Sequence, residues 1–311
     1  MRIGVMATGA VGGYFGARLQ QAGHEVAFIA RGSHLEALRK DGLKITSPVG
    51  NLHLKKVTAT DDPRTIGPVD IVLFAVKLWD TEKAGERTKP LIGPDTAVIT
   101  LQNGVDSVAR LDPLLGSTHV VGGLTYIGSR LAGPGAIQHI GLADIRCGER
   151  DGKPSKRLLA FAEVAKQAGF DFAISDNIEL DLWKKFVFLV GFSGITTVTR
   201  KPFGELYPDT DCRALFHDLM TETLAVGRAR GVPLPPDFAD ERLAFAAKLP
   251  PATKSSMLYD FEQKNRLELD WLAGTVVRMG RETGVPTPAN AAVYAALKPW
   301  RMGTKSGAFK S

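Results

Sequence analysis

The sequence has few cysteines, no long apolar run and no dense basic run, and each absence excludes a class of protein. The two cysteines, Cys147 and Cys212, cannot form a disulfide framework and do not have metal-ligand spacing. The longest apolar stretches, residues 71–76 and 186–192, are far shorter than the roughly 20 residues of a transmembrane helix. The first residues have a strand pattern and lack the apolar core of a signal peptide. We therefore expect a cytoplasmic protein with no membrane partner.

The charged residues give no indication of a nucleic-acid partner. The formal net charge is +6, from 39 Lys and Arg against 33 Asp and Glu. The basic residues are scattered among acids and lack the dense, aromatic-interleaved runs of a nucleic-acid surface. The six histidines show no paired metal-ligand spacing, so no metal is expected. A small phosphate-rich ligand would need only a few of the surplus cations.

The first half of the chain alternates short apolar runs with helical patterns. Strands are predicted at 3–6, 25–29, 44–46, 52–57, 70–76 and 97–101, and helices at 12–22, 33–40 (with Ser33 as N-cap) and 81–91. This alternation indicates a parallel sheet with right-handed crossovers. Three short strands at 119–127, 136–139 and 144–146 are expected to extend the sheet in antiparallel fashion. A helix at 154–169 and a strand at 172–174 follow.

The second half is helical. Helices are predicted at 178–198, 211–230, 238–249, 270–283 and 290–297, separated by proline-rich breaks. At 311 residues the chain suits two domains. The fold class expected is an α/β Rossmann-type domain, with a parallel sheet and an antiparallel extension, followed by an all-α domain. We place a nucleotide-binding domain at 1–172 and a helical substrate and catalytic domain at 173–311, with a frayed tail from Gly303.

A glycine loop at the N-terminus is the most informative local feature. It follows a strand and opens a helix, which is the context in which a G-x-G-x-x-G loop binds a dinucleotide. Gly9 would let the backbone approach the pyrophosphate, Gly12 would let helix and strand pack closely, and Ala7 replaces the usual first glycine. An ordinary strand-to-helix turn is the alternative. The predicted cofactor-binding loop consists of Ala7, Thr8, Gly9, Ala10, Val11 and Gly12.

The residue after the second strand indicates which dinucleotide binds. An NAD site usually has an acid about 20 residues past the loop, which holds the ribose hydroxyls. Here the strand is followed by Ala30 and Arg31, and the guanidinium of Arg31 suits a 2′-phosphate. We therefore expect NADPH rather than NADH, unless Arg31 is simply a surface residue.

Two further polar positions follow predicted parallel strands. Lys77 comes directly after residues 73–76, and Asn103 lies in the Gln102-Asn103-Gly104 turn after residues 98–101. Open α/β sheets bind ligands at the carboxyl ends of their strands. Taken alone, a solvated lysine and an ordinary Asn-Gly turn would explain both positions.

Five ordered motifs give the chain a resemblance to the ketopantoate reductase (2-dehydropantoate 2-reductase) family. Besides the glycine loop they are residues 74–77 (Phe-Ala-Val-Lys), 101–104 (Leu-Gln-Asn-Gly), 183–186 (Trp-Lys-Lys-Phe) and 255–260 (Ser-Ser-Met-Leu-Tyr-Asp), with Glu268 further on. The resemblance covers essentially the whole chain. It implies an interdomain active site and NADPH-dependent reduction of a 2-oxo acid to a 2-hydroxy acid, most directly of 2-dehydropantoate in pantothenate biosynthesis.

The resemblance also implies roles for individual residues. Lys185 matches the catalytic lysine, and Asn103 matches the asparagine that contacts both cofactor and substrate. Lys77 matches a cofactor-contacting lysine, and Ser256 matches a substrate-binding serine. Glu268 matches an acid near the cofactor and the catalytic lysine. Ile127 matches a backbone contact to the cofactor.

The chain departs from the family at two substrate positions. Typical members have asparagines four and eight residues after the catalytic lysine, where this chain has Leu189 and Ser193. Positions 185, 189 and 193 share one helix face, so Leu189 and Ser193 are predicted to face the substrate. A leucine cannot form the hydrogen bond of an asparagine, which favours a less polar oxo acid as an alternative substrate.

Other functions stay open at this stage. A non-catalytic NADPH-binding sensor would retain the loop without the chemistry, and a flavin enzyme would share the loop. The sequence does not decide the oligomeric state, and a homodimer formed through the helical half is one option.

Overall fold

The computed structural model describes residues 1–304, and its contacts divide the chain into two compact units. The first unit comprises Met1–Glu179 and the second Leu180–Ser311. We predicted a frayed tail from Gly303, but the N–H of Gly303 donates to the carbonyl of Trp300 and the N–H of Thr304 donates to the carbonyl of Lys264. The remainder of the predicted tail, 305–311, lies outside the described residues.

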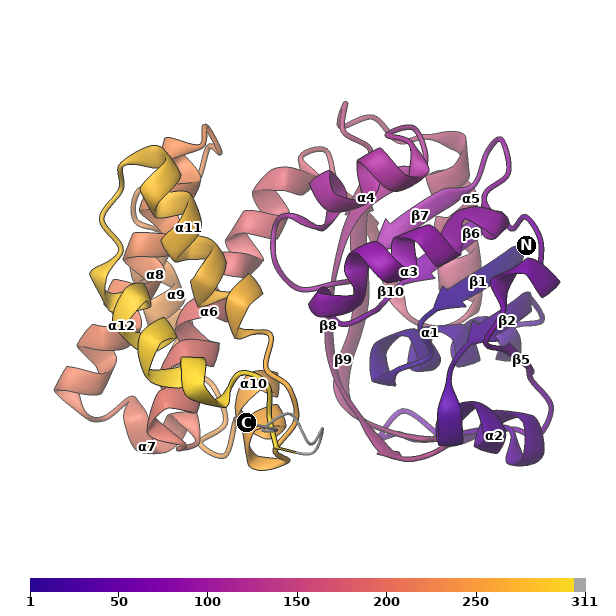
Figure 1. Ribbon diagram of the computed structural model, residues 1–311, viewed down its shortest axis with the longest axis horizontal. Coiled ribbons are helices and arrows are strands. Elements are labelled where there is room, and N and C mark those ends of the chain that lie inside the picture. The colour runs from indigo at the N-terminus through magenta and orange to yellow at the C-terminus, as the bar shows by residue number, and fades with distance from the viewer. Residues whose placement is uncertain (305–311) are drawn as a thin grey trace, which may run out of the picture. The chain divides into compact units, whose positions relative to one another are not determined.

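The first unit is built on one ten-stranded sheet (Figure 1). The strand order is β4-β3-β9-β8-β7-β6-β1-β2-β5, and β10 pairs with β9. The strands are β1 (Arg2–Met6), β2 (Glu25–Ile29), β3 (Leu43–Thr46), β4 (Leu52–Leu54), β5 (Thr58–Thr60), β6 (Ile71–Phe74), β7 (Ala97–Thr100), β8 (Val120–Gly133), β9 (Ala136–Gly148) and β10 (Asp171–Ile174). The pairings β7-β6-β1-β2-β5 are all parallel, so the carboxyl ends of these strands share one edge. Every residue of β6 and β7 is buried, as expected for strands covered on both faces.

The antiparallel extension is one long hairpin instead of the three short strands that we predicted. β8 and β9 pair antiparallel from Gly122 opposite Gly148 to Gly133 opposite Ala136. The register shifts near Gly128, where a Cβ would lie 2.9 Å from the carbonyl oxygen of Gly141. Glycines at such a bulge let the two backbones approach closely and the pairing continue. The sequence breaks therefore mark an irregularity inside a strand and do not end it.

Five α-helices belong wholly to the first unit. They are α1 (Ala10–Gln21), α2 (Gly32–Asp41), α3 (Thr81–Thr88), α4 (Ser107–Leu115) and α5 (Lys156–Gln167). The sequence did not predict α4, which is short and contains Pro113. Ser33 as N-cap of the second helix was also wrong, because α2 begins at Gly32 with Arg31 in the N-cap position and no side-chain cap.

The second unit consists of helices. α6 (Ile178–Thr199) runs into it from the first unit, followed by α7 (Phe203–Leu206), α8 (Thr210–Ala229), α9 (Phe238–Ala246), α10 (Ser256–Glu262), α11 (Ala273–Thr283) and α12 (Pro288–Leu297). The carboxylate of Glu222 on α8 accepts the backbone N–H groups of Ala289 and Asn290 in the first turn of α12. These two hydrogen bonds satisfy backbone N–H groups that have no partner within the helix. The predicted fold class, a Rossmann-type α/β region followed by an all-α region, is confirmed.

None of the helices formed by residues 1–304 combines the length and the apolar character that a membrane crossing requires.

Candidate active site

The loop between β1 and α1 turns tightly and leaves the start of α1 open. The backbone N–H and the hydroxyl of Thr8 both donate to the carbonyl oxygen of Ile29, at 2.8 and 3.1 Å, and so fix the loop to the end of β2. Gly9 is the N-cap of α1, and no side chain caps the helix. The first turn of α1 contains no acid. Unpaired N–H groups and the helix dipole therefore make this end of α1 suited to an anion such as a pyrophosphate.

Gly9 and Gly12 have different structural reasons to be glycine. A Cβ on Gly12 would lie 2.5 Å from the carbonyl oxygen of Ala7 and 2.8 Å from Cγ1 of Val5, so the helix could not pack this closely against β1. A Cβ on Gly9 would meet no atom within 4 Å. Packing does not exclude a side chain at position 9, and the space beside Gly9 is open, so a ligand could approach the backbone here.

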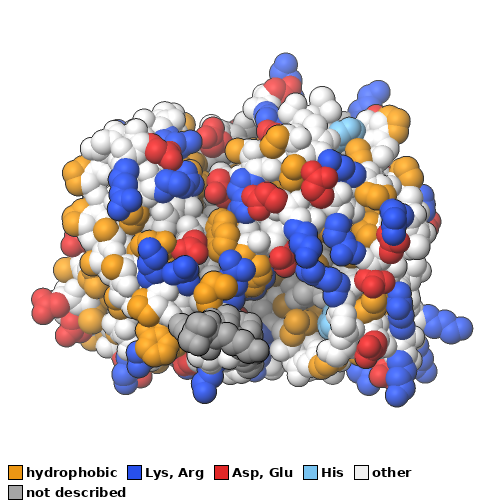
Figure 2. All heavy atoms as spheres, viewed as in Figure 1, with side chains coloured by type: hydrophobic (Ala, Val, Ile, Leu, Met, Phe, Trp, Pro, Cys, Tyr) orange, Lys and Arg blue, Asp and Glu red, His pale blue; other side chains and the backbone are white. Residues whose placement is uncertain are grey.

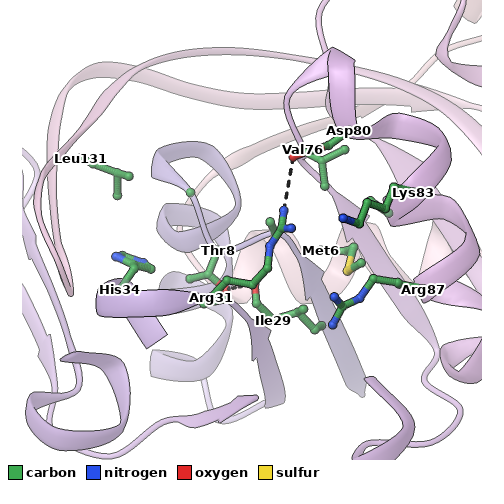
Figure 3. A pocket seen from close by; sticks show the side chains of 14 residues that line it. Met6, Thr8, Ile29, Arg31, His34, Val76, Asp80, Lys83, Arg87 and Leu131 are labelled. Carbon is green, nitrogen blue, oxygen red and sulfur yellow. Dashed lines mark hydrogen bonds and ion pairs between the residues drawn. The ribbon is translucent and has the colours of Figure 1, made fainter. Parts of the chain in front are cut away.

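A cavity of about 210 Å³ opens beside this loop (Figure 3). Its wall includes Ala7, Thr8 and Gly9 from the predicted loop and Arg31, which follows β2 and is the N-cap of α2. The predicted Ala10, Val11 and Gly12 continue into α1 and do not line the cavity. His34 and Leu131 close one side, and residues of α3 form the opposite side. The cavity is thus at the carboxyl ends of β1 and β2, where open α/β sheets bind nucleotides.

The cavity is lined by more positive than negative charge. Arg31, Lys83 and Arg87 line it together with a single acid, Asp80. One Nη of Arg31 lies 3.2 Å from a carboxylate oxygen of Asp80, and this ion pair is partly exposed, with 56% and 34% of the two side chains accessible. An anionic group that entered the cavity would therefore meet a net positive charge.

His34 contributes a neutral ring to the cavity wall. The backbone N–H of Gly135 donates to Nδ1 of His34 at 3.1 Å, so this nitrogen acts as the acceptor. Burial lowers the pKa of His34 below its ordinary value of 6.5. The imidazole is therefore uncharged at neutral pH.

Lys77 and Asn103 lie at the carboxyl ends of β6 and β7, outside the cavity wall. Between them the buried side-chain amide of Gln102 donates to the carbonyl of Val76 at 3.0 Å and to the hydroxyl of Thr81 at 2.9 Å. Gln102 therefore holds the loop after β7 against the loop after β6. Asn103 is half-buried and Lys77 is exposed, with its amine 5.7 Å from the ring centre of Trp79.

Ile127 belongs to β8 and pairs with Ala143 immediately before the bulge. It is half-buried and does not line the cavity.

In the second unit, Lys185, Leu189 and Ser193 follow one another at intervals of four residues on α6. Lys185 and Leu189 are half-buried, whereas Ser193 is fully buried. Within residues 1–304 the hydroxyl of Ser193 has no hydrogen-bond partner. Of the three predicted positions, only Ser193, at the carboxyl end of this face, is fully buried.

A hydrogen bond joins α6 to α10 beyond that face. The hydroxyl of Thr196 donates to Oγ of Ser255 at 2.8 Å, and Ser255 caps α10 by accepting the N–H of Leu258. Ser255 is thus the helix cap, and its neighbour Ser256 begins the helix with an exposed side chain. Glu268, the other predicted residue of this unit, is buried with 7% of its surface accessible.

Several residues of the cavity and of its support were not predicted from the sequence. They are His34, Asp80, Lys83, Arg87 and Leu131 in the wall and Gln102 beneath it. Lys83 and Arg87 are four residues apart and share one face of α3, a helix that the sequence did predict, and Asp80 immediately precedes that helix. That spacing was the available signal.

Comparison with known proteins assigns the whole chain to one family. The family model described as ketopantoate reductase PanE/ApbA matches residues 3–152, and the model of its C-terminal part matches residues 177–301. The 2-dehydropantoate 2-reductase of Archaeoglobus fulgidus is 33% identical over 290 residues, which are 93% of this chain and 94% of that protein. The enzyme of the same name from Nostoc sp. is 30% identical over 299 residues, 94% of this chain and 93% of that protein.

A solved structure supports the same assignment. The PanE/ApbA family ketopantoate reductase from Ralstonia eutropha JMP134 is 34% identical in sequence and superposes with a TM-score of 0.89. The match covers 97% of this chain and 98% of that protein. Sequence and fold therefore agree over nearly the full length. The chain belongs to the ketopantoate reductase family of oxidoreductases.

Proposed function

We propose that the protein reduces a 2-oxo acid to a 2-hydroxy acid with NADPH, and that 2-dehydropantoate, in pantothenate biosynthesis, is its leading substrate. The observation that supports this most is the open start of α1 at Gly9 beside a cavity lined by Arg31, Lys83 and Arg87. The family and the names of the relatives support the substrate class.

The residues around the cavity fit a phosphorylated dinucleotide. The start of α1 would hold the pyrophosphate, because its N–H groups have no cap and no acid competes for them. Arg31 occupies the place after β2 where an NAD site usually has an acid, and its guanidinium suits the 2′-phosphate. The N-terminus of α2, which also has no side-chain cap, begins at the next residue. NADP is therefore the better match of the two nicotinamide cofactors.

Reduction of a ketone needs a hydride for the carbonyl carbon and a proton for its oxygen. The nicotinamide cofactor supplies the hydride when it is bound. We assign the proton to Lys185, whose ammonium would donate a hydrogen bond to the carbonyl oxygen and stabilise the negative charge that develops there. Its half-buried position on α6 restricts the motion of the amine while leaving it accessible.

The remaining predicted residues would position the reactants. Asn103 and Lys77 would contact the cofactor from the strand ends that Gln102 holds together. The backbone of Ile127 would add a further contact. Ser256 would donate its exposed hydroxyl to the substrate. Glu268 would hold the ammonium of Lys185 in place through its buried carboxylate.

An assay of NADPH oxidation with a panel of 2-oxo acids tests the proposal. We expect turnover with 2-dehydropantoate and a clear preference for NADPH over NADH. Absence of turnover with every 2-oxo acid, with either cofactor, would contradict the proposed reaction.

A second candidate is reduction of a less polar 2-oxo acid by the same site. Leu189 is half-buried and cannot hydrogen-bond, and Ser193 is fully buried, so neither side chain replaces the amide of an asparagine. If this candidate holds, a 2-oxo acid without a hydroxyl is a better substrate than 2-dehydropantoate. The variant Leu189→Asn should then shift kcat/KM towards 2-dehydropantoate.

A further inference from the structure

The start of α3 faces Arg31 across the cavity. Asp80 immediately precedes α3, and Lys83 and Arg87 lie on the following turns. In Figure 3 the side chains of Lys83 and Arg87 extend from α3 towards the side of the cavity that Arg31 occupies. Figure 2 shows Lys and Arg side chains interspersed with Asp and Glu on the visible side of the first unit. A group bound beside Arg31 would therefore also meet α3.

Lys83 is the cation that is available to such a group. The neighbouring acids of α3 are already paired elsewhere, Glu82 with Arg110 at 2.7 Å and Glu86 with Lys89 at 2.6 Å. Among residues 1–304, Lys83 forms no ion pair of its own. Its exposed ammonium can move towards an anion without breaking an existing contact.

Arg87 differs from Lys83 because it is already held. Its guanidinium donates to the backbone carbonyl of Asp61, in the loop after β5. This hydrogen bond fixes the direction of the Arg87 side chain, whose guanidinium contributes positive charge at the cavity wall. A ligand would have to share the guanidinium with the carbonyl of Asp61.

Asp80 acts in the opposite direction. Its carboxylate already occupies one edge of the Arg31 guanidinium, at 3.2 Å. A 2′-phosphate that bound Arg31 would lie close to this negative charge, and like charges at such distances repel. A ribose 2′-hydroxyl could instead donate a hydrogen bond to the carboxylate of Asp80, just as it does to the conserved acid of an NAD site.

We propose that the start of α3 sets the cofactor preference of this chain, with Lys83 favouring a 2′-phosphorylated dinucleotide and Asp80 opposing it. This inference rests on the proposed function, because it places the adenosine ribose of the cofactor in this cavity. It adds two specificity-determining residues to Arg31. It also explains why an acid lies among three cations: Asp80 orients Arg31 and moderates the selectivity.

Equilibrium binding of NADP⁺ and NAD⁺ to the full-length protein, measured by isothermal titration calorimetry without substrate, tests the inference. We expect Lys83→Met to weaken NADP⁺ binding by about tenfold and to leave NAD⁺ binding within about twofold. Lys83→Arg retains the charge and should keep the preference. Lys89→Met serves as the matched control, because Lys89 is paired with Glu86 and lies outside the cavity wall.

The complementary variant is Asp80→Asn, which removes the negative charge and keeps the shape of the side chain. We expect NADP⁺ to bind roughly three- to tenfold more tightly and NAD⁺ to bind more weakly. Higher ionic strength should reduce the difference between the wild type and Lys83→Met for NADP⁺.

Several results would overturn the inference. Equal effects of Lys83→Met on NADP⁺ and NAD⁺, an unchanged NADP⁺ affinity, or weaker NADP⁺ binding by Asp80→Asn would each contradict it. A wild type that binds neither dinucleotide would overturn it as well. If the binding ratios shift as expected but no 2-oxo acid is reduced, the inference holds and the proposed reaction fails.

Discussion

The two glycines of the β1–α1 loop should respond differently to the same substitution. Both Gly9→Ala and Gly12→Ala add a single methyl group. At Gly12 the new carbon would lie 2.5 Å from a backbone oxygen and 2.8 Å from a buried valine methyl group. At Gly9 it would meet no protein atom within 4 Å, and the backbone φ of −86° is accessible to alanine.

The magnitudes follow from these environments. Overpacking at Gly12 costs about 2–3 kcal/mol, and the better helix propensity of alanine returns about 1 kcal/mol. The net loss of about 1–2 kcal/mol corresponds to a fall in Tm of about 2–8 °C for a unit of this size. Gly9→Ala should change Tm by less than about 2 °C, because the weaker N-cap is offset by a less flexible unfolded chain. Its methyl group would instead occupy the space of the pyrophosphate and weaken NADP⁺ binding by about tenfold or more.

Differential scanning fluorimetry and calorimetric titration with NADP⁺ together decide the matter. We expect the stability defect in Gly12→Ala and the binding defect, at normal stability, in Gly9→Ala. Unchanged NADP⁺ binding by Gly9→Ala would refute the assignment of this loop to the pyrophosphate. A Gly12→Ala protein as stable as the wild type would refute the packing argument.

Three further predictions concern the support of the site and the stability of each unit. Gln102→Leu removes the two hydrogen bonds that the buried amide donates, and should cost about 1–3 kcal/mol of stability and raise the KM for NADPH, measured by thermal unfolding and steady-state kinetics. Burial raises the pKa of Glu149, but hydrogen bonds from Arg157 and Ser155 outweigh it and leave the pKa below 4.5. The ionised Glu149 therefore stabilises the fold fully above pH 4.5, and this stabilisation is lost as the pH falls below that value. The Tm of Glu149→Gln should decline less steeply with falling pH than the Tm of the wild type, as measured by thermal unfolding. Ser193→Ala removes a buried hydroxyl that has no partner within residues 1–304, and should keep or slightly raise Tm; a clear fall in Tm would show that this hydroxyl is bonded in solution.

The sequence predicted those parts of the structure whose cause is local. The apolar runs of the parallel strands, the glycine loop and the amphipathic helices each contain their own signal, and the structure confirms the α/β region and the helical region that follows it. The continuous β8–β9 hairpin escaped prediction because the glycines at its bulge look like turns when the partner strand is unknown. α4 escaped because it is short and includes Pro113.

The candidate site could be predicted only where a motif names the residue. Arg31 was found because the rule for the end of the second strand points to it. Lys83 and Asp80 were not, because only the folded chain shows that the start of α3 faces Arg31. The structural role of Gln102 likewise depends on two partners, Val76 and Thr81, that are more than 20 residues away in the sequence.

Steady-state NADPH oxidation with a 2-oxo acid substrate, compared between Lys185→Met and Lys184→Met, tests the central claim most directly. Adjacent residues of a helix point about 100° apart, so Lys184 is a matched control for charge and position. We expect Lys185→Met to lose about 10³-fold in kcat while it still binds NADP⁺, and Lys184→Met to retain activity within a few-fold. Activity of Lys185→Met close to that of the wild type would contradict the assignment of the proton donor and the reaction mechanism built on it.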